Sequence, residues 1–449
     1  MAQSAEQTSR DLLAEALESG ELQWVRQSIN STLRPVEVAR LIESSPPHRR
    51  EALWELLDQS LEGEVLQHLS DDVQVHFLSR MDTATLVAVT GTMDDDDVAD
   101  IMQQLPQSVV LEVLEAMDSQ TRERLERVLA YPEDSAGGLM TTDVITVRPD
   151  ISIDTALRYL RLHPELPEMT DSLLVVSRQD QFLGILPLTR MLVSQPDTLV
   201  RELMITDIEP IHADTHDAEV AKIFEQLDLV SAPVVDDLGN LLGRITIDDV
   251  VDVIREDADH SLMSMAGLDE DEDTFAPTMK TARRRAIWLG INLLTAFTAA
   301  AVIGLFEHTI EKVVALAVLM PIVASMGGIA GSQTLTLIIR AMALGQVDRG
   351  NTRWLLNREL VVGALNGLLW AVVVAAAAGW WFDDPLLSGL IAAALMINLL
   401  IAALAGTTLP LALRAWGIDP ALAGGVLLTT ITDVVGFFAF LGLATLFYA

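Results

Sequence analysis

Five long apolar segments in the C-terminal part of the chain limit what it can fold into. Each holds about 20 residues or more, the length that an α-helix needs to cross roughly 30 Å of hydrocarbon. The sequence therefore predicts an α-helical membrane domain with five spans per chain. The spans are expected at residues 286–306, 313–337, 360–382, 386–409 and 421–448.

Basic residues flank these segments on one side. They precede the first span and fill the links between spans two and three and between spans four and five, whereas the opposite side holds only Lys312. Because basic residues favour the cytoplasmic side, we expect a multi-pass protein of the inner (plasma) membrane with its N-terminus in the cytoplasm and its C-terminus outside. The polar N-terminal residues do not resemble a signal peptide.

The part before the membrane domain is strongly acidic. Residues from 283 onward hold 9 of the 29 basic and 8 of the 64 acidic residues, so that residues 1–282 carry a formal charge of about −36. Such a field repels nucleic acid and attracts cations. Acidic surfaces also keep proteins soluble or reflect a salt-tolerant host, and both explanations remain open. The absence of cysteine excludes disulfides and thiolate metal sites.

Polar residues inside the spans are concentrated in the second one, and the last span contains a single charged side chain, Asp433. A carboxylate at membrane depth is costly and usually belongs to an ion or proton path. A lone Asn or Thr more often holds helices together, but the whole cluster together with Asp433 favours a lined pathway. The cluster and its counterpart in span four comprise Pro321, Ser325, Gly327, Gly328, Gly331, Ser332, Gln333, Thr334, Thr336 and Asn398.

Five helices are few to enclose a pore, so we expect a homodimer in contact with membrane lipid, since twofold assemblies are the commonest kind. Two copies of Asp433 facing the axis would form a carboxylate ring for cations. Mg²⁺ is usually bound through one or two carboxylates and several waters. Co²⁺ or Ni²⁺ would fit equally well, so this chemistry does not select the metal.

The acidic part contains two kinds of repeat. An apolar residue followed by a capping residue or proline recurs every 12 residues between 57 and 118, which predicts stacked short helices in a superhelix. One helix start carries Asp94 to Asp97, either a solvated cap or a metal site. Further on, the segment 139–144 recurs 64 residues later as 203–208, and each copy continues with a β-α-β-β-α pattern.

This duplication resembles a pair of CBS domains. In that family a Ser or Thr followed three residues later by Asp often holds a nucleotide ribose, and Thr246 and Asp249 match in the second copy. The first copy has Pro187 and Arg190 there. The resemblance thus implies ATP or another adenosine nucleotide as a ligand, while a pair used only for dimerisation is an alternative.

The order of parts resembles the MgtE family of Mg²⁺ channels or transporters over essentially the whole chain. The most specific motifs are Glu133-Asp134-Ser135-Ala136-Gly137-Gly138-Leu139-Met140, Gly327-Gly328-Ile329-Ala330-Gly331-Ser332-Gln333 and Thr432-Asp433-Val434. One departure is Ile329, where the family usually has Asn near the pore. The family implies a multidomain protein: an all-α superhelical N-domain (1–132), an α/β tandem CBS pair (133–200 and 201–258), a connecting helix and acidic linker (259–282, the helix starting near 249) and a transmembrane pore domain (283–449).

The resemblance also implies residue roles. The pore and its ion selectivity would involve Asp433, Gly328, Ile329, Gln333 and Asn398. Regulatory Mg²⁺ would bind acidic residues and close the path when cytosolic Mg²⁺ is high; these are Glu64, Asp96, Asp100, Asp228, Asp249, Asp252, Asp257 and Asp419.

Two other functions are consistent with the residues. One is a transporter of another divalent cation such as Co²⁺, and the other is a membrane-anchored CBS nucleotide sensor whose spans only anchor and dimerise it. An enzyme is not expected, because the eight histidines form no ligand spacing and no nucleophile–base motif or phosphate loop is present.

Overall fold

The computed structural model describes residues 22–91, 93, 95–162, 166–167, 169–268, 273–348 and 350–448. Asp94, Arg349 and most of the acidic run 269–273 lie outside the described residues. The chain divides into two compact units, and each is described by itself. The first consists of residues 1–259 with 271–277, and the second consists of residues 260–270 with 278–449.

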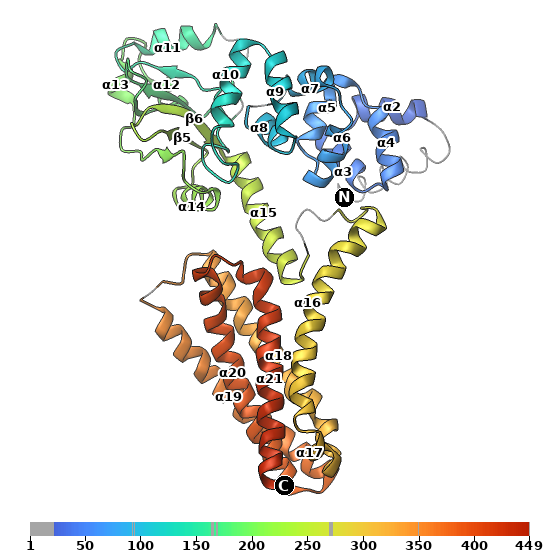
Figure 1. Ribbon diagram of the computed structural model, residues 1–449. Helices are drawn as coiled ribbons and strands as arrows, with labels where there is room; N and C mark the ends of the chain where they lie inside the picture. The colour runs from blue at the N-terminus through green and yellow to red at the C-terminus, as the bar shows by residue number, and fades with distance from the viewer. Residues whose placement is uncertain are drawn as a thin grey trace. The chain divides into compact units, whose positions relative to one another are not determined.

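The predicted 12-residue repeat is confirmed by consecutive short helices that pack around one apolar core (Figure 1). Six of them begin at intervals of 12 residues, from Gln59 to Ser119. Asp82 and Asp118 accept hydrogen bonds from backbone N–H groups of the helices that follow them, as N-caps do. The described helices of this part are α2 (Leu22–Ser31), α3 (Pro35–Glu43), α4 (Pro47–Glu55), α5 (Gln59–Leu66), α6 (Asp71–Leu78), α7 (Thr83–Thr90), α8 (Asp95–Gln103), α9 (Gln107–Ala116) and α10 (Ser119–Val128).

The duplicated segment folds into two three-stranded sheets, ordered β1-β2-β3 and β4-β5-β6. In each copy the first two strands are parallel and the last two antiparallel. The predicted β-α-β-β-α order is confirmed. The elements are β1 (Thr146–Val147), α11 (Ile153–Leu160), β2 (Ser172–Val176), β3 (Phe182–Pro187), α12 (Leu188–Val193), α13 (Val200–Leu203), β4 (Ile211–His212), α14 (Asp217–Leu227), β5 (Ser231–Val235) and β6 (Leu241–Thr246).

The connecting helix begins close to residue 249, near which the sequence predicts its start. Helix α15 (Ile247–Met265) begins two residues before 249, and it ends well before residue 282. Gly267 follows with a φ of +70°, a left-handed conformation that suits glycine at a helix end. Residues 273–277 are irregular and end at Pro277, directly before the next helix.

The second unit contains five helices that are long and apolar enough to cross a membrane. Helix α20 packs against α18, α19 and α21, and α16 packs against α21 (Figure 1). A Cβ added at Gly406 of α20 would lie 2.9 Å from the carbonyl oxygen of Gly331 in α18, so glycine allows these backbones to approach closely. The helices are α16 (Thr278–Gly304), the short α17 (Glu307–Lys312), α18 (Ala315–Ala343), α19 (Thr352–Phe382), α20 (Pro385–Ala415) and α21 (Pro420–Tyr448).

Candidate functional site

An open groove of about 590 Å³ runs along one face of the second unit. Helix α18 supplies most of its wall, because residues three, four and seven apart share one face of a helix. Three residues predicted for the ion path, Gly328, Ile329 and Gln333, are brought together here. The lining consists of Gly328, Ile329, Ser332, Gln333 and Thr336 of α18 with Thr429 of α21.

Most of the groove surface is apolar, but hydroxyl and carboxamide groups also line it. Four of the lining residues are exposed at the surface of the single chain: Ser332, Gln333, Thr336 and Thr429. A carboxamide or hydroxyl facing hydrocarbon without a partner is unfavourable. This face therefore suits contact with water or with another protein surface better than contact with lipid.

Asp433 lies on the same face of α21 as Thr429, one helical turn further along, because the two are four residues apart. Helices α18 and α21 run antiparallel: Leu428 faces Gly331, and Gly436 faces Val323. Asp433 is thus level with the part of α18 between these contacts. Asp433 is half-buried, and it lies one helical turn beyond the groove residue Thr429.

Asn398 does not lie in the groove, in contrast to the prediction that it lines the path. It is completely buried, and its Nδ2 donates a hydrogen bond of 2.8 Å to the backbone carbonyl of Val323. Its side chain fills the space left by Gly327 and Gly436, so that an added Cβ would lie 2.2 Å and 2.7 Å from Nδ2. Asn398 therefore ties α20 to α18 and α21 behind the groove.

The sequence interpretation missed Glu359, a carboxylate that is 5 % exposed near the start of α19. Its Oε1 accepts a hydrogen bond of 2.8 Å from Arg358, and its Oε2 accepts one of 3.4 Å from Thr334, beside the groove residue Gln333. With Asp433 it is one of two carboxylates in the five spanning helices. Its position directly before the apolar stretch 360–382 was the signal that could have found it.

Acidic residues converge on Asp100 of α8 in the first unit. Burial, followed by the charges of neighbouring acids, raises the pKa of Asp100 to about 8; these acids are Glu133, Asp97, Glu256 and Asp249. Like charges this close disfavour ionisation, and a divalent cation would remove that penalty. Two of the predicted regulatory residues, Asp100 and Asp249, thus belong to one cluster.

Two further predicted residues, Glu64 of α5 and Asp252 of α15, both act on His68. Burial lowers the pKa of His68, whereas the negative charges of Asp252 and Glu64 raise it. Glu64 and Asp252 are exposed, and Asp252 forms an ion pair of 3.6 Å with Arg255. The N-terminal helices and α15 therefore present a second pair of acids to each other.

The remaining predicted regulatory residues lie on several elements of the two units. Asp96 is buried in α8, and Asp257 is exposed on α15. Asp228 ends α14 in a left-handed conformation. In the second unit, Asp419 accepts hydrogen bonds from the first backbone N–H groups of α21 and forms an ion pair of 3.4 Å with His260.

Thr246 and Asp249, the predicted nucleotide-binding pair, contact each other. The Thr246 hydroxyl donates to Asp249 at 2.9 Å, and the Thr246 backbone N–H donates to the same oxygen at 3.2 Å. The hydroxyl also contacts Asp248. In the first copy, Arg190 instead donates to the carbonyl of Leu203 at 3.3 Å.

Comparison with known proteins places these features in a family. A model described as a divalent cation transporter, MgtE, matches residues 320–443. The MgtE intracellular N domain matches residues 33–134, and the CBS domain matches residues 136–195 and 200–256. A magnesium transporter MgtE from Thermus thermophilus is 31 % identical over 97 % of both chains. The chain belongs to the MgtE family.

A second MgtE relative, a magnesium transporter of Bacillus subtilis, is 27 % identical over 94 % of this chain and 93 % of its own. A solved structure of the cytosolic domain of the Mg²⁺ channel MgtE in complex with ATP is 31 % identical and covers 54 % of this chain and 98 % of its own, with a TM-score of 0.49. The predicted MgtE resemblance and multidomain fold class are confirmed. Members of this family are membrane transporters and not enzymes.

Proposed function

We propose that this MgtE protein is a homodimeric Mg²⁺ channel or transporter of the inner membrane, with a cytoplasmic N-terminus and an outward C-terminus. The observation that carries the proposal is the groove of α18 and α21, which holds hydroxyl and carboxamide groups, with Asp433 one helical turn from its residue Thr429. Both Mg²⁺ relatives support the choice of ion.

A twofold axis along the membrane normal would set the grooves of two protomers against each other. Gln333 and the groove hydroxyls would then face water inside a shared pathway, and the two Asp433 carboxylates would meet a hydrated cation. Mg²⁺ keeps most of its water, so one or two carboxylates with hydroxyl and carbonyl partners suit it. Ile329, 57 % exposed in the groove, adds an apolar surface to this path.

We further propose that cytosolic Mg²⁺ regulates the pathway through the acids around Asp100 and between Glu64 and Asp252. Divalent cations there would bind only the arrangement that brings α8 and α5 close to α15, and would shift the population toward it. Helix α15 carries Asp249, Asp252 and Glu256 in its first half and His260, the partner of Asp419, in its second half. It is therefore the element on which regulation would act.

The test is Mg²⁺ flux into liposomes that contain the purified full chain. We expect Asp433→Asn to reduce the flux at least tenfold, that is by about 1.4 kcal/mol or more in barrier height. Asp383→Asn is the matched control, because Asp383 is an exposed carboxylate at the end of α19 and its left-handed conformation also suits Asn. Normal Mg²⁺ flux in Asp433→Asn would refute the pathway.

The same assay separates the alternatives. Flux of Co²⁺ but not Mg²⁺ through the unmodified chain would reassign the transported ion. A membrane-anchored nucleotide sensor predicts no Asp433-dependent flux of either ion, together with adenosine nucleotide binding that Thr246→Ala abolishes.

A further inference from the structure

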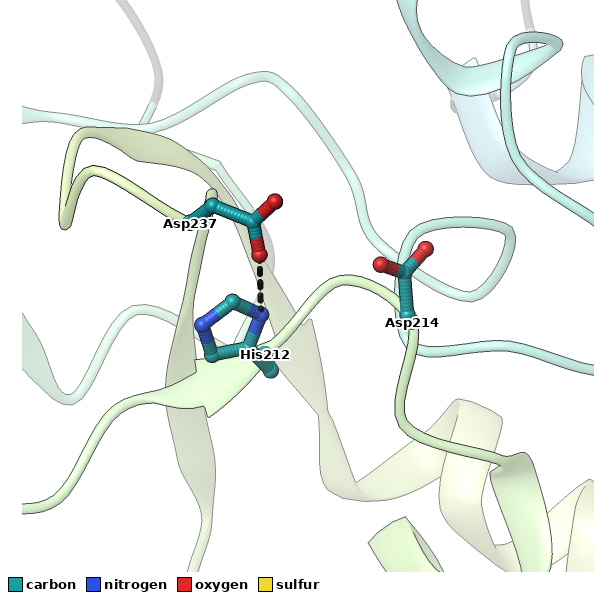
Figure 2. A group of neighbouring side chains, drawn as sticks. All are labelled: His212, Asp214 and Asp237. Carbon is teal, nitrogen blue, oxygen red and sulfur yellow. Dashed lines mark ion pairs between the residues drawn. The ribbon is translucent and has the colours of Figure 1, made fainter.

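Three side chains that can bind a metal ion meet at one edge of the second CBS sheet, outside both acidic clusters described above. Figure 2 shows the imidazole of His212 facing the carboxylate of Asp237, with Asp214 on the neighbouring connection. His212 Nδ1 and Asp237 Oδ1 are 3.7 Å apart. One ligand atom from each of the three residues lies within 4.8 Å of the other two.

The topology of the sheet explains why they meet. Strands β4 and β5 are parallel, and His212 pairs with Val235 at their carboxyl ends. His212 is the last residue of β4, Asp214 follows two residues later, and Asp237 lies two residues after the end of β5. The carboxyl ends of adjacent parallel strands meet at one edge of a sheet, where open α/β folds often bind ligands.

The first CBS copy serves as an internal comparison. Its Arg148 and Asp150 precede His212 and Asp214 by 64 residues, and Arg178 occupies the place of Asp237, two residues after the end of β2. There the charges compensate one another: Arg178 and Asp150 are 3.8 Å apart, and Arg148 lies 3.1 Å from Asp180. The same positions thus carry two arginines and an aspartate in one copy, and a histidine and two aspartates in the other.

The second copy therefore gathers negative charge where the first copy neutralises it. This negative charge also acts on Tyr131. Burial raises the pKa of Tyr131, and the charges of Asp214, Asp236 and Asp237 raise it further. A bound cation would take the place that the arginines fill in the first copy.

We propose that His212, Asp214 and Asp237 form a binding site for a divalent transition metal ion of the Zn²⁺ class. An imidazole nitrogen favours such ions over Mg²⁺, which prefers oxygen ligands. Because the three ligand atoms lie within 4.8 Å of one another, an ion placed midway between them would be at most about 2.8 Å from each. The bonds from Zn²⁺ to nitrogen and oxygen ligands are roughly 2.0–2.2 Å long. Side-chain movements of less than about 1 Å complete the site. The CBS pair would thus respond to a metal other than the transported ion.

The test is Zn²⁺ binding to the full chain in detergent, measured by calorimetry with excess Mg²⁺ to fill the all-oxygen sites. We expect one Zn²⁺ per chain at this site, and we expect His212→Ala to weaken it at least about tenfold, as the loss of a metal-binding group does. Asp237→Arg should abolish binding, because it restores the charge pairing of the first copy.

Two matched controls make the result specific. Asp150→Asn alters the corresponding aspartate of the first copy, and His216→Ala removes a nearby imidazole that pairs with Asp134. Both should bind Zn²⁺ with unchanged affinity. The proposal is overturned if no Zn²⁺ binds in excess Mg²⁺, if His212→Ala binds as tightly as the unmodified chain, or if either control loses the ion.

Discussion

A buried ion pair attaches the segment before α16 to the N-terminal helices. Arg50 of α4 forms two hydrogen bonds to Asp273, of 2.6 and 2.7 Å, and the two side chains are only 5 % and 10 % exposed. Arg50 also donates to the carbonyls of Ile42 and Glu43, and the ring of Phe275 lies 5.9 Å from its guanidinium carbon. Residues 273–277 are thus held within the first unit.

Asp273→Asn is predicted to release this segment. It leaves the Arg50 charge buried without its counter-charge, which typically costs about 3–5 kcal/mol. Since 1.4 kcal/mol is a factor of ten, the open fraction of the segment rises roughly a hundred- to several-thousand-fold. The substitution keeps the size of the side chain, so the effect measures charge rather than packing.

Amide hydrogen exchange of the full chain measures how often this segment opens. The backbone N–H groups of Phe275 and Ala276 donate to Asp273, so their exchange rates follow the open fraction. Asp154→Asn is the control, because it breaks an exposed pair of 2.7 Å with Arg158, worth at most about 1 kcal/mol. Replacing both partners, as in Arg50→Met with Asp273→Leu, should recover much of the protection. Unchanged exchange in Asp273→Asn would refute the reasoning.

Two further predictions concern packing and pH. Gly327→Ala should destabilise the membrane unit by about 1–3 kcal/mol, because the added Cβ would overlap Asn398. Gly328→Ala is the control, since its Cβ would meet open space and the variant should fold normally. Thermal unfolding in detergent compares the two variants, and equal midpoint temperatures would contradict the packing argument. Without divalent cations, the pKa of Asp100 near 8 means that the folded state holds a proton that the unfolded state has lost above about pH 4. The free energy of unfolding of the first unit, measured by urea titration, should therefore fall between pH 6 and pH 8. Asp100→Asn should reduce this dependence of the free energy on pH. An equal pH dependence in the two proteins would show that another group is responsible.

The repeating and apolar patterns were enough to predict the elements. Stretches of about 20 apolar residues predicted the five spans, because a helix of that length crosses the hydrocarbon and satisfies its own backbone hydrogen bonds there. The 12-residue step predicted where short helices begin, and the duplicated segment predicted two copies of one sheet. These features depend on residues close together in the chain, so periodicity and capping chemistry reveal them. Asp433 was found in the same way, as one charge in an apolar span.

Long-range packing decided which polar residues act together. Asn398 and Gln333 look alike as polar residues in spans, yet one is buried against Val323 and the other lines the groove. Asp100 owes its high pKa first to burial and then to acids as distant in the chain as Glu256, and His212 meets Asp237 only because β4 pairs with β5. A side chain's burial and charge environment depend on neighbours that only the folded chain brings near, and no local pattern encodes them.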